Sequence, residues 1–402
     1  MHKAMMASLA ALLLVVSSYG ATVSSRRVTK SKSQITEKPG TKKKLSATRH
    51  SRPVATRSAR TRARRVRHRY YERFTASSFA SNQTIGDVTT GEDPLVRQAA
   101  VDALGDMNGT VVAIDPSSGR VLAMVNQKLA LSEGAQPCST IKVSVALAAL
   151  SEGVVTKDTK VNLGGWHMDM NQALAHSNNQ YFEALGRKLG FEKVSYYAHQ
   201  FGLGELAGWN IEGEHLGEYP AEPISAKLGG VGKMCSFGEG ISMTPLQLGA
   251  LVSAIANGGT LYYLQHPTSA DEVANYQPKI KRYLDIAPLI PEVSVGMLGA
   301  TQFGTARSLR ASFFQEDVLG KTGTCSKDGT RFGWFASYAN TQYGRIVTVF
   351  FLEGGRPTFG PKAAELAGKF YRSLYDGNYF AVRPAATAMK TPATTNAVGA
   401  TQ

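Results

Sequence analysis

Residues 139–151 have the sequence Ser139-Thr-Ile-Lys142-Val-Ser-Val-Ala-Leu-Ala-Ala-Leu-Ser151. Apolar side chains line one face and Gly153 follows, so the pattern predicts a helix. Residues three apart share a helix face, which lets the Lys142 amine reach the Ser139 hydroxyl. A serine needs such a base to act as a nucleophile, and burial or a neighbouring cation lowers a lysine pKa enough for that role. The free N–H groups at the helix start would face a developing oxyanion.

A second candidate motif, Ser177-Asn178-Asn179, precedes another helix-like segment that reaches Leu189. Ser and Asn both cap helix N-termini well, so capping alone explains the motif. Alternatively, Ser177 passes a proton between Lys142 and a leaving amine, while Asn179 fixes the lysine and binds a substrate peptide. The residues alone leave both interpretations open.

A third motif, Lys321-Thr322-Gly323-Thr324, lies in a segment with the composition of a strand. Lysine and threonine on an edge strand can serve solubility alone. Glycine inside a strand more often marks a close approach to the backbone. A cation with two hydroxyls beside bare backbone is a candidate cradle for a substrate carboxylate.

Strand-like segments stand at both ends of the patterned region, and helices fill the chain between them. The predicted strands are Thr110–Ile114, Val121–Val125, Val318–Cys325, Phe332–Tyr338 and Arg345–Glu353, and the predicted helices are 139–151, 179–189, 245–256 and 361–374. A hairpin turn joins the first two strands. We therefore predict an α+β domain: an antiparallel β-sheet formed by its N- and C-terminal parts, flanked by helices, with a helical insertion subdomain.

Composition divides the chain further. We predict a signal peptide, or alternatively a membrane anchor, in residues 1–23, a basic disordered linker in 24–92, the domain in 93–380 and a disordered tail in 381–402. The net charge of +15 belongs to the linker, because Ser25 to Arg73 holds 18 Lys and Arg against two acids. We expect an exported protein, periplasmic or extracytoplasmic, and membrane-anchored if the first segment is uncleaved.

The basic linker has two interpretations. It is either a solvated spacer or a segment that adheres to anionic envelope polymers or lipids. No nucleic-acid partner is expected, because aromatic residues are not interleaved with the bases until Tyr70. Three cysteines without CxxC spacing predict no metal site, and their odd number leaves at least one thiol outside an internal disulfide.

The three motifs occur in the order found in active-serine penicillin-binding enzymes. From about Asn108 to Tyr371 the chain resembles the transpeptidase domain of the high-molecular-weight penicillin-binding proteins. Further similar stretches are residues 115–124, 177–186, 201–204, 238–248, 256–259 and 334–338.

The resemblance implies a peptidoglycan D,D-transpeptidase or D,D-carboxypeptidase that works through an acyl-serine intermediate. Its partners would be stem peptides ending in D-Ala-D-Ala, with β-lactams as covalent inhibitors, and it would use no cofactor or metal. Lys321 and the two threonines would hold the terminal carboxylate, and the N–H groups of Ser139 and Thr324 would form the oxyanion hole. The residues carried over are, as catalytic, Ser139, Lys142 and Ser177, and, as substrate-binding, Asn179, Lys321, Thr322, Gly323 and Thr324.

Three departures from the family pattern stand out. Cys138 stands where the family often has glycine, and the first two motifs are closer together than expected, which predicts a trimmed loop over the cleft. We expect no pedestal or glycosyltransferase domain before it, because the preceding residues are predicted to be signal peptide and linker. If the N–H groups of Ser139 and Thr324 meet at one oxygen, Cys138 and Cys325 must also lie close together. A disulfide there would rigidify or distort the oxyanion hole.

Two other functions stay open. A class D-like serine β-lactamase or a β-lactam sensor shares the fold, although class D enzymes usually carry an apolar residue at the position of Asn179. A class A enzyme activates water with a glutamate, and Glu212 and Glu214 lie in about the right region without the expected Asn partner. A non-catalytic wall-associated scaffold is the third possibility.

Overall fold

A computed structural model of the protein describes residues 73–341 and 344–382. These residues belong to Arg69–Gln402, one of the two compact units into which the chain divides. The predictions for residues 1–23, for most of the linker and for nearly all of the tail lie outside the described residues.

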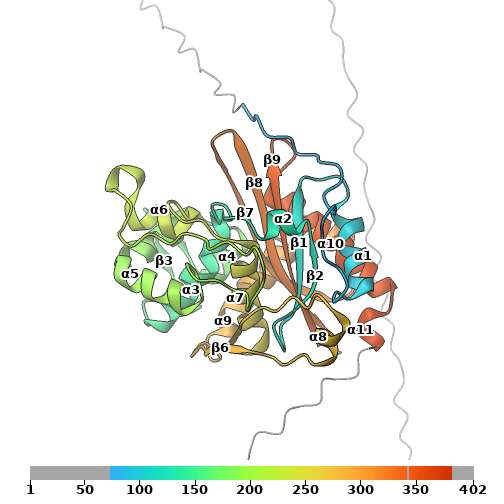
Figure 1. The fold of residues 1–402 in the computed structure, drawn as a ribbon. Helices are drawn as coiled ribbons and strands as arrows, with labels where there is room; N and C mark the ends of the chain where they lie inside the picture. The colour runs from blue at the N-terminus through green and yellow to red at the C-terminus, as the bar shows by residue number, and fades with distance from the viewer. Residues whose placement is uncertain (1–72, 342–343, 383–402) are drawn as a thin grey trace, which may run out of the picture. The chain divides into compact units, whose positions relative to one another are not determined.

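The described domain contains a five-stranded antiparallel sheet of strand order β2-β1-β9-β8-β7 (Figure 1). The N-terminal hairpin joins the C-terminal strands where β1 pairs with β9, with Val112 opposite Val349. This pairing confirms the predicted α+β class, with a sheet built from both ends of the domain. The strands of this sheet are β1 (Gly109–Asp115), β2 (Arg120–Val125), β7 (Asp317–Lys327), β8 (Thr330–Thr341) and β9 (Gly344–Gly354). Two small sheets pair β3 (Val161–Asn162) with β4 (His167–Met168), and β5 (Thr260–Tyr262) with β6 (Ile280–Tyr283).

Helices pack on both faces of the sheet. Helices α1 (Pro94–Leu104) and α10 (Gly360–Asp376) lie on one face, and α7 (Pro245–Asn257) lies on the other (Figure 1). Successive side chains of a strand point to opposite faces. Phe350 of β9 accordingly packs against Phe370 of α10, whereas Phe351 stacks on Trp334 on the side of α7. The sheet is therefore buried on both faces.

The remaining helices lie mainly in the chain between β2 and β7, which confirms the helical insertion. They are α2 (Gln127–Ala130), η1 (Cys138–Ile141), α3 (Lys142–Ser151), α4 (Met170–Ala175), α5 (Asn179–Gln200), η2 (Ala226–Leu228), α6 (Gly230–Phe237), α8 (Ala270–Ala274), α9 (Ile290–Gln302) and η3 (Arg307–Ala311), followed near the C-terminus by α11 (Tyr379–Val382). Here η denotes a 3₁₀ helix.

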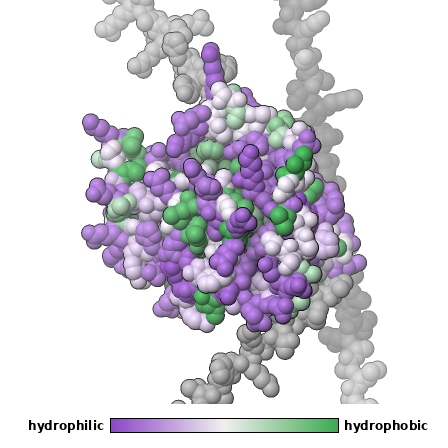
Figure 2. Space-filling model, in the orientation of Figure 1, coloured by the Kyte–Doolittle hydropathy of each residue, from purple (hydrophilic) through white to green (hydrophobic). Residues whose placement is uncertain are grey.

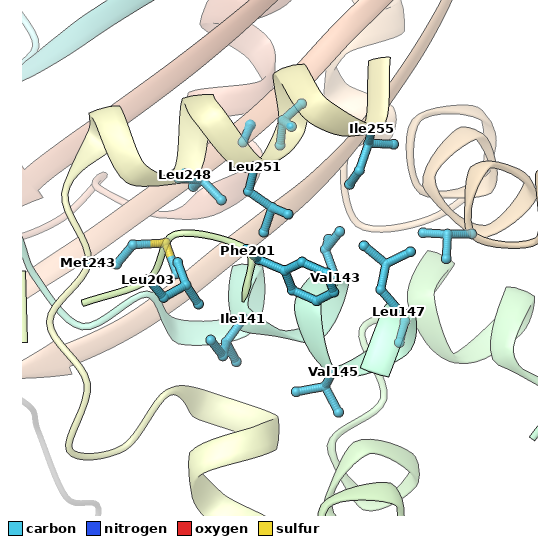
Figure 3. Packing of buried hydrophobic residues seen from close by; sticks show 14 of the residues in the cluster. Ile141, Val143, Val145, Leu147, Phe201, Leu203, Met243, Leu248, Leu251 and Ile255 are labelled. Carbon is cyan, nitrogen blue, oxygen red and sulfur yellow. The ribbon is translucent and has the colours of Figure 1, made fainter. Parts of the chain in front are cut away.

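Helix α7 connects the insertion with the sheet. Residues 245–256 of this helix are all buried. Its apolar side chains meet those of η1 and α3, and Phe201 lies between the two layers (Figure 3). A capping box begins the helix, since Thr244 Oγ1 accepts from the Gln247 N–H and the Gln247 side chain accepts from the Thr244 N–H. Such a cap stabilises a helix by about 1 kcal/mol.

Two predicted helices differ in detail from the structure. The helix expected over 139–151 begins with the 3₁₀ turn η1, in which residues three apart are almost eclipsed, so Ser139 and Lys142 align closely. Helix α5 does not end at Leu189. It continues to Gln200 past Gly190, whose φ of 78° interrupts the helix and kinks it.

The predicted disorder of residues 24–92 does not extend through its last part. Residues 73–92 pack on the domain, because the N–H of Thr75 donates to Gly329 O, the N–H of Asn108 donates to Ser78 O, and Asp87 forms a 2.6 Å ion pair with Arg97. Composition missed this segment because backbone hydrogen bonds and buried carboxylates, rather than apolar side chains, hold it.

Apolar residues on the surface are dispersed. Figure 2 shows them on the viewed face as small patches separated by hydrophilic side chains, the usual character of a protein surface. Among residues 73–341 and 344–382, no helix has both the length and the apolar character needed to cross a bilayer.

Candidate active site

Ser139 lies in the first turn of η1, which packs against the edge strand β7. Gly323 permits this approach. A Cβ at position 323 would lie 2.8 Å from the carbonyl oxygen of Pro137, closer than real side chains come. The predicted meaning of a glycine in this strand, a close backbone approach, is what the structure shows. Ser139 remains 9% exposed, at the surface of the cleft between η1 and β7.

Lys142 follows one turn later and is fully buried. Its Nζ lies 2.6 Å from Ser139 Oγ, 2.8 Å from Asn179 Oδ1 and 2.7 Å from the carbonyl oxygen of Ser236. The rings of Phe182 and Phe237 stand with their centroids 5.8 Å from the same nitrogen. Burial, and secondarily the charge of Lys321, lowers the pKa of Lys142 well below its ordinary value.

The three partners of Lys142 fit either protonation state of its amine. An ammonium has three N–H groups and can donate to all three oxygens, whereas a neutral amine has two N–H groups and one lone pair. The amide and carbonyl oxygens of Asn179 and Ser236 can only accept, so in the neutral form, which burial favours, they take the two N–H groups. The lone pair is then left for the Ser139 hydroxyl, 2.6 Å away. In its neutral form Lys142 is therefore placed to act as a base toward Ser139.

The second lysine, Lys321, lies on β7 and is 1% exposed. Its Nζ donates to Ser177 Oγ at 2.8 Å and to the carbonyl oxygen of Thr322 at 2.9 Å. An ammonium has a third N–H, which these two bonds leave for a ligand. Burial lowers the pKa of Lys321 to about 7, so its charge responds to small changes near neutral pH.

Ser177 occupies a position that sequence patterns describe only in part. Asn178, not Ser177, caps α5, because the Asn178 side chain accepts from the N–H of Tyr181. Ser177 instead has φ of 56°, an uncommon conformation for a residue with a side chain. Its hydroxyl binds Lys321 rather than Lys142. The capping interpretation thus fails for Ser177, and the direct link to Lys142 that we expected is not made.

Thr322 and Thr324 are each held by a second group. Thr322 Oγ1 lies 2.7 Å from Thr305 Oγ1, and Thr324 Oγ1 accepts from the N–H of Gly360 at 2.8 Å. Gly360 begins α10, and a Cβ there would lie 2.7 Å from the Gly323 carbonyl oxygen. Thr324 Oγ1 already accepts a hydrogen bond from the Gly360 N–H, so its own O–H remains to donate to a ligand.

The backbone of β7 presents N–H groups at the free edge of the sheet. The carbonyl oxygens of Val318 and Thr322 accept from the Thr301 and Lys321 side chains, so they point away from β8. In an antiparallel strand the N–H and C=O of one residue point to the same side, and every second residue points to that side. The N–H of Thr324 therefore also points away from β8. The N–H of Ser139, in the first turn of η1, has no acceptor within its helix.

Cys138 and Cys325 form a disulfide with a Cα separation of 5.5 Å. The proximity expected from the proposed oxyanion hole is therefore present. Cys138 has φ of 53°, a left-handed conformation for which glycine is the usual residue. The third cysteine, Cys235, is buried and unbridged.

The structure brings all eight sequence-predicted residues to one cleft, in two bonded groups: Ser139, Lys142 and Asn179 in one, and Ser177, Lys321 and Thr322 in the other, with Gly323 and Thr324 continuing the strand. Sequence reasoning missed the carbonyl of Ser236, the hydroxyl of Thr305 and the N–H of Gly360. A backbone group carries no sequence signal, and a lone Thr has no distinctive spacing. In the described part of the chain, no group of three or more His, Cys, Asp or Glu side chains is arranged to hold a metal ion.

Comparison with known families matches residues 109–372 to the family described as "Penicillin binding protein transpeptidase domain". Stage V sporulation protein D of Bacillus subtilis is 28% identical over 260 residues, which cover 54% of this chain and 39% of that protein. Peptidoglycan D,D-transpeptidase MrdA of Acinetobacter baumannii is 24% identical over 344 residues, which cover 67% of this chain and 51% of that protein. The chain thus spans about half, or less, of the length of these relatives.

A third relative, peptidoglycan D,D-transpeptidase PbpA of Mycobacterium tuberculosis, is 25% identical over 366 residues, 72% of each chain. Among solved structures, PBP2 of Pseudomonas aeruginosa in complex with WCK 5153 superposes with a TM-score of 0.58 at 23% identity, covering 72% of this chain and 78% of that one. The D,D-transpeptidase domain of a peptidoglycan glycosyltransferase from Eggerthella lenta gives a TM-score of 0.54 at 21% identity, covering 71% and 81%. At these identities the structures establish the fold alone.

Proposed function

Because this chain belongs to the penicillin-binding protein transpeptidase family, we propose that it is a peptidoglycan D,D-transpeptidase that works through an acyl-serine intermediate and is acylated by β-lactams. One observation carries the proposal: the buried Lys142 Nζ lies 2.6 Å from Ser139 Oγ, and Asn179 and Ser236 offer acceptors for the two N–H groups of its neutral form. A base in this position is what turns a serine into a nucleophile.

In the acylation step, the Ser139 hydroxyl gives its proton to Lys142, and Oγ bonds to the carbonyl carbon of the penultimate D-Ala. The carbonyl oxygen becomes an oxyanion, for which the N–H groups of Ser139 and Thr324 are the proposed donors. The C–N bond then breaks and the terminal D-Ala leaves. Its nitrogen takes the proton of the Ser177 hydroxyl, which Lys321 replaces through its hydrogen bond to Ser177 Oγ, while the Ser139 proton stays on Lys142. In the second step the attacking amine would return a proton to Lys321 through Ser177, and Lys142 would return its proton to Ser139 Oγ.

The edge strand β7 would orient the substrate. Lys321 has an N–H left for a ligand, and Thr322 and Thr324 present hydroxyls beside it, so a terminal carboxylate is the ligand that this set fits best. Asn179, fixed by Lys142, is the proposed contact for the peptide backbone of the substrate. In the second step an amine of a neighbouring stem peptide attacks the acyl-serine and restores the Ser139 hydroxyl.

Rapid hydrolysis in the class A manner would need a glutamate that activates water. The Glu214 carboxylate instead accepts the backbone N–H groups of Ala207 and Gly208, at 2.9 to 3.1 Å, within its own loop. This arrangement argues against a class A β-lactamase.

The experiment that tests the proposal is labelling with a fluorescent penicillin followed by product analysis. We expect a stable label on the wild-type protein that Ser139→Ala abolishes. Mass spectrometry of products from a pentapeptide muropeptide should then show cross-linked dimers. Tetrapeptide without dimers would indicate a carboxypeptidase, fast turnover of nitrocefin a β-lactamase, and absence of any label a scaffold.

We also propose that the protein acts outside the cytoplasm, because that is where cross-linkable peptidoglycan lies. The basic segment Ser25–Arg73 would then adhere to anionic wall polymers or lipid headgroups. A protein in which half of these lysines and arginines are replaced by glutamine should sediment less with isolated envelopes, and equal sedimentation would contradict the role.

A further inference from the structure

The disulfide Cys138–Cys325 links the two chain segments that carry the proposed oxyanion donors. Cys138 directly precedes Ser139 on η1, and Cys325 directly follows Thr324 on β7. Each backbone N–H proposed for the oxyanion hole is therefore one residue from a bridged cysteine. The bridge has a Cα separation of 5.5 Å, within the usual range for a disulfide.

A covalent link matters here because the two donors come from separate layers of the fold. One lies at the start of a 3₁₀ turn of the insertion and the other on an edge strand, with no regular hydrogen-bond ladder between them. Donors stabilise an oxyanion only when they stand at hydrogen-bond distance from its final position. Small relative movement of η1 and β7 would widen that gap, and the disulfide limits the movement.

The backbone conformation of Cys138 also indicates that the disulfide holds this segment in place. Its φ of 53° is unfavourable for a residue with a side chain, and such strain persists only where surrounding contacts impose it. The disulfide is one contact that imposes this conformation on Cys138. Hydrogen bonds of the two preceding residues are the others: the Gln136 carbonyl accepts from Trp334 Nε1 at 3.0 Å, and the Pro137 carbonyl accepts from the Thr140 N–H. These hydrogen bonds should keep the loop folded without the bridge, but with more freedom.

We propose that the Cys138–Cys325 disulfide is a positioning element of the oxyanion hole, so that the rate of serine acylation depends on its redox state. The inference rests on the proposed function and adds to it. The two cysteines are positioning residues, because their sulfurs act only through the neighbouring N–H groups.

The redox step balances with an external dithiol. A thiolate attacks Sγ of Cys325, the partially exposed partner, while Cys138 is fully buried. The S–S bond breaks, its electron pair stays on Cys138 as a thiolate, and a mixed disulfide forms at Cys325. The second thiol of the reagent closes its own disulfide and releases Cys325, so two electrons pass from the dithiol to the bridge.

The test compares the full chain before and after dithiothreitol, with reduction verified by mass spectrometry. Stopped-flow labelling with a fluorescent penicillin separates the dissociation constant of the first complex, Ks, from the acylation rate constant, k2. We expect k2 to fall about tenfold on reduction, less than the ~10²–10³ for loss of an oxyanion donor, while Ks stays within twofold. Cys325→Ser should show the reduced rate with no response to dithiol, and Cys235→Ala should respond as the wild type does.

Loss of the bridge also lowers the stability of the folded state, so the rates are compared well below the thermal transition, with the folded state checked by circular dichroism. An unchanged k2, or a fall in k2 matched by a rise in Ks, would overturn the inference and leave the proposed function intact. So would Cys138→Gly acylating at the oxidised wild-type rate, since glycine relieves the strain without the link. Absence of label in both redox states would overturn the proposed function itself.

Discussion

Two buried lysines, Lys142 on the helical side of the cleft and Lys321 on its strand side, differ in the partners that surround them. Lys142 has three oxygen partners, of which one is the Ser139 hydroxyl. Lys321 has two, Ser177 Oγ and the Thr322 carbonyl, which leave one N–H of an ammonium for a ligand. Burial is the largest cause of the lowered pKa in both.

The comparison shows that burial alone does not assign a role to a lysine. Desolvation favours the neutral form of each amine, but the arrangement of acceptors decides what the amine then does. A nitrogen whose N–H groups are both taken by acceptors presents its lone pair and acts as a base. A nitrogen with an unused N–H presents a donor and binds an anion.

The largest effect is expected for Lys142→Met, which keeps the shape of the side chain and removes the base. Acylation by fluorescent penicillin should fall by about 10²–10⁴-fold, because Ser139 loses its proton acceptor. Rates are measured on protein whose circular dichroism matches the wild type, since the Asn179 and Ser236 oxygens lose a donor. A variant that keeps a tenth of the wild-type rate would show that another group is the base.

Lys321→Met should mainly weaken binding. A hydrogen bond to a charged group contributes about 1.5–3 kcal/mol, so Ks for a carboxylate-bearing penicillin should rise roughly 10- to 100-fold while k2 changes less. Stopped-flow separation of Ks and k2 tests this. If Lys321→Met lowers k2 as strongly as Lys142→Met does, the division of roles between the lysines is wrong.

The pH dependence sharpens the contrast, because the two lysines are needed in opposite protonation states. Lys142 must be neutral, so k2 rises with pH until this group has lost its proton. Lys321 must be charged, and with a pKa of about 7 it loses its charge as the pH rises through neutrality, so Ks increases. The profile of k2/Ks should therefore be bell-shaped.

Lys321→Arg provides the check on that profile. Arginine keeps its charge throughout the accessible range, so the alkaline fall in k2/Ks should flatten while the acid side stays. The absolute affinity should be lower than in the wild type, because a planar guanidinium fits the Ser177 and Thr322 partners less well. If k2/Ks still falls at alkaline pH in Lys321→Arg as it does in the wild type, the titration of another group causes that fall.

The smallest effect is expected at Thr305, which touches the strand side of the cleft only through Thr322. Thr305→Val removes one neutral hydrogen bond worth about 1 kcal/mol, so Ks should rise about fivefold. Thr301→Val is the matched control. Its hydroxyl binds the Val318 carbonyl on the same strand, outside the substrate cradle, so it should lower the thermal midpoint and leave Ks unchanged.

Much of the fold follows from local patterns. Strand-like segments placed the five strands of the main sheet, and the range 245–256 placed α7. Local patterns failed where contacts between distant residues determine the structure. Beyond Gly190 the second half of α5 is tied to the end of α3, because Lys193 and Tyr197 both bind the Glu152 carboxylate. Residues 73–92 are held by partners far along the chain.

The candidate site shows the same division. Its eight residues could be selected from the sequence because their order and spacing are distinctive. The hydrogen-bond partner of each residue could not be predicted in this way. Ser177 is the clearest example, because its motif suggested a link to Lys142, whereas in the structure its hydroxyl binds Lys321. The lysine that the Ser177 hydroxyl binds depends on how closely the turn between α4 and α5 approaches β7. No local sequence pattern encodes that distance.

The order of residues along the chain by itself determined the strands and helices, the nucleophile with a lysine one turn away, and the cysteine beside it. Only the tertiary structure decided which protons each lysine can give or take, and that Cys138 and Cys325, expected to lie close together, are joined by a bridge. The physical reason is that secondary structure arises from contacts within a few residues, whereas protonation and cross-linking depend on burial and on atoms that folding alone brings together.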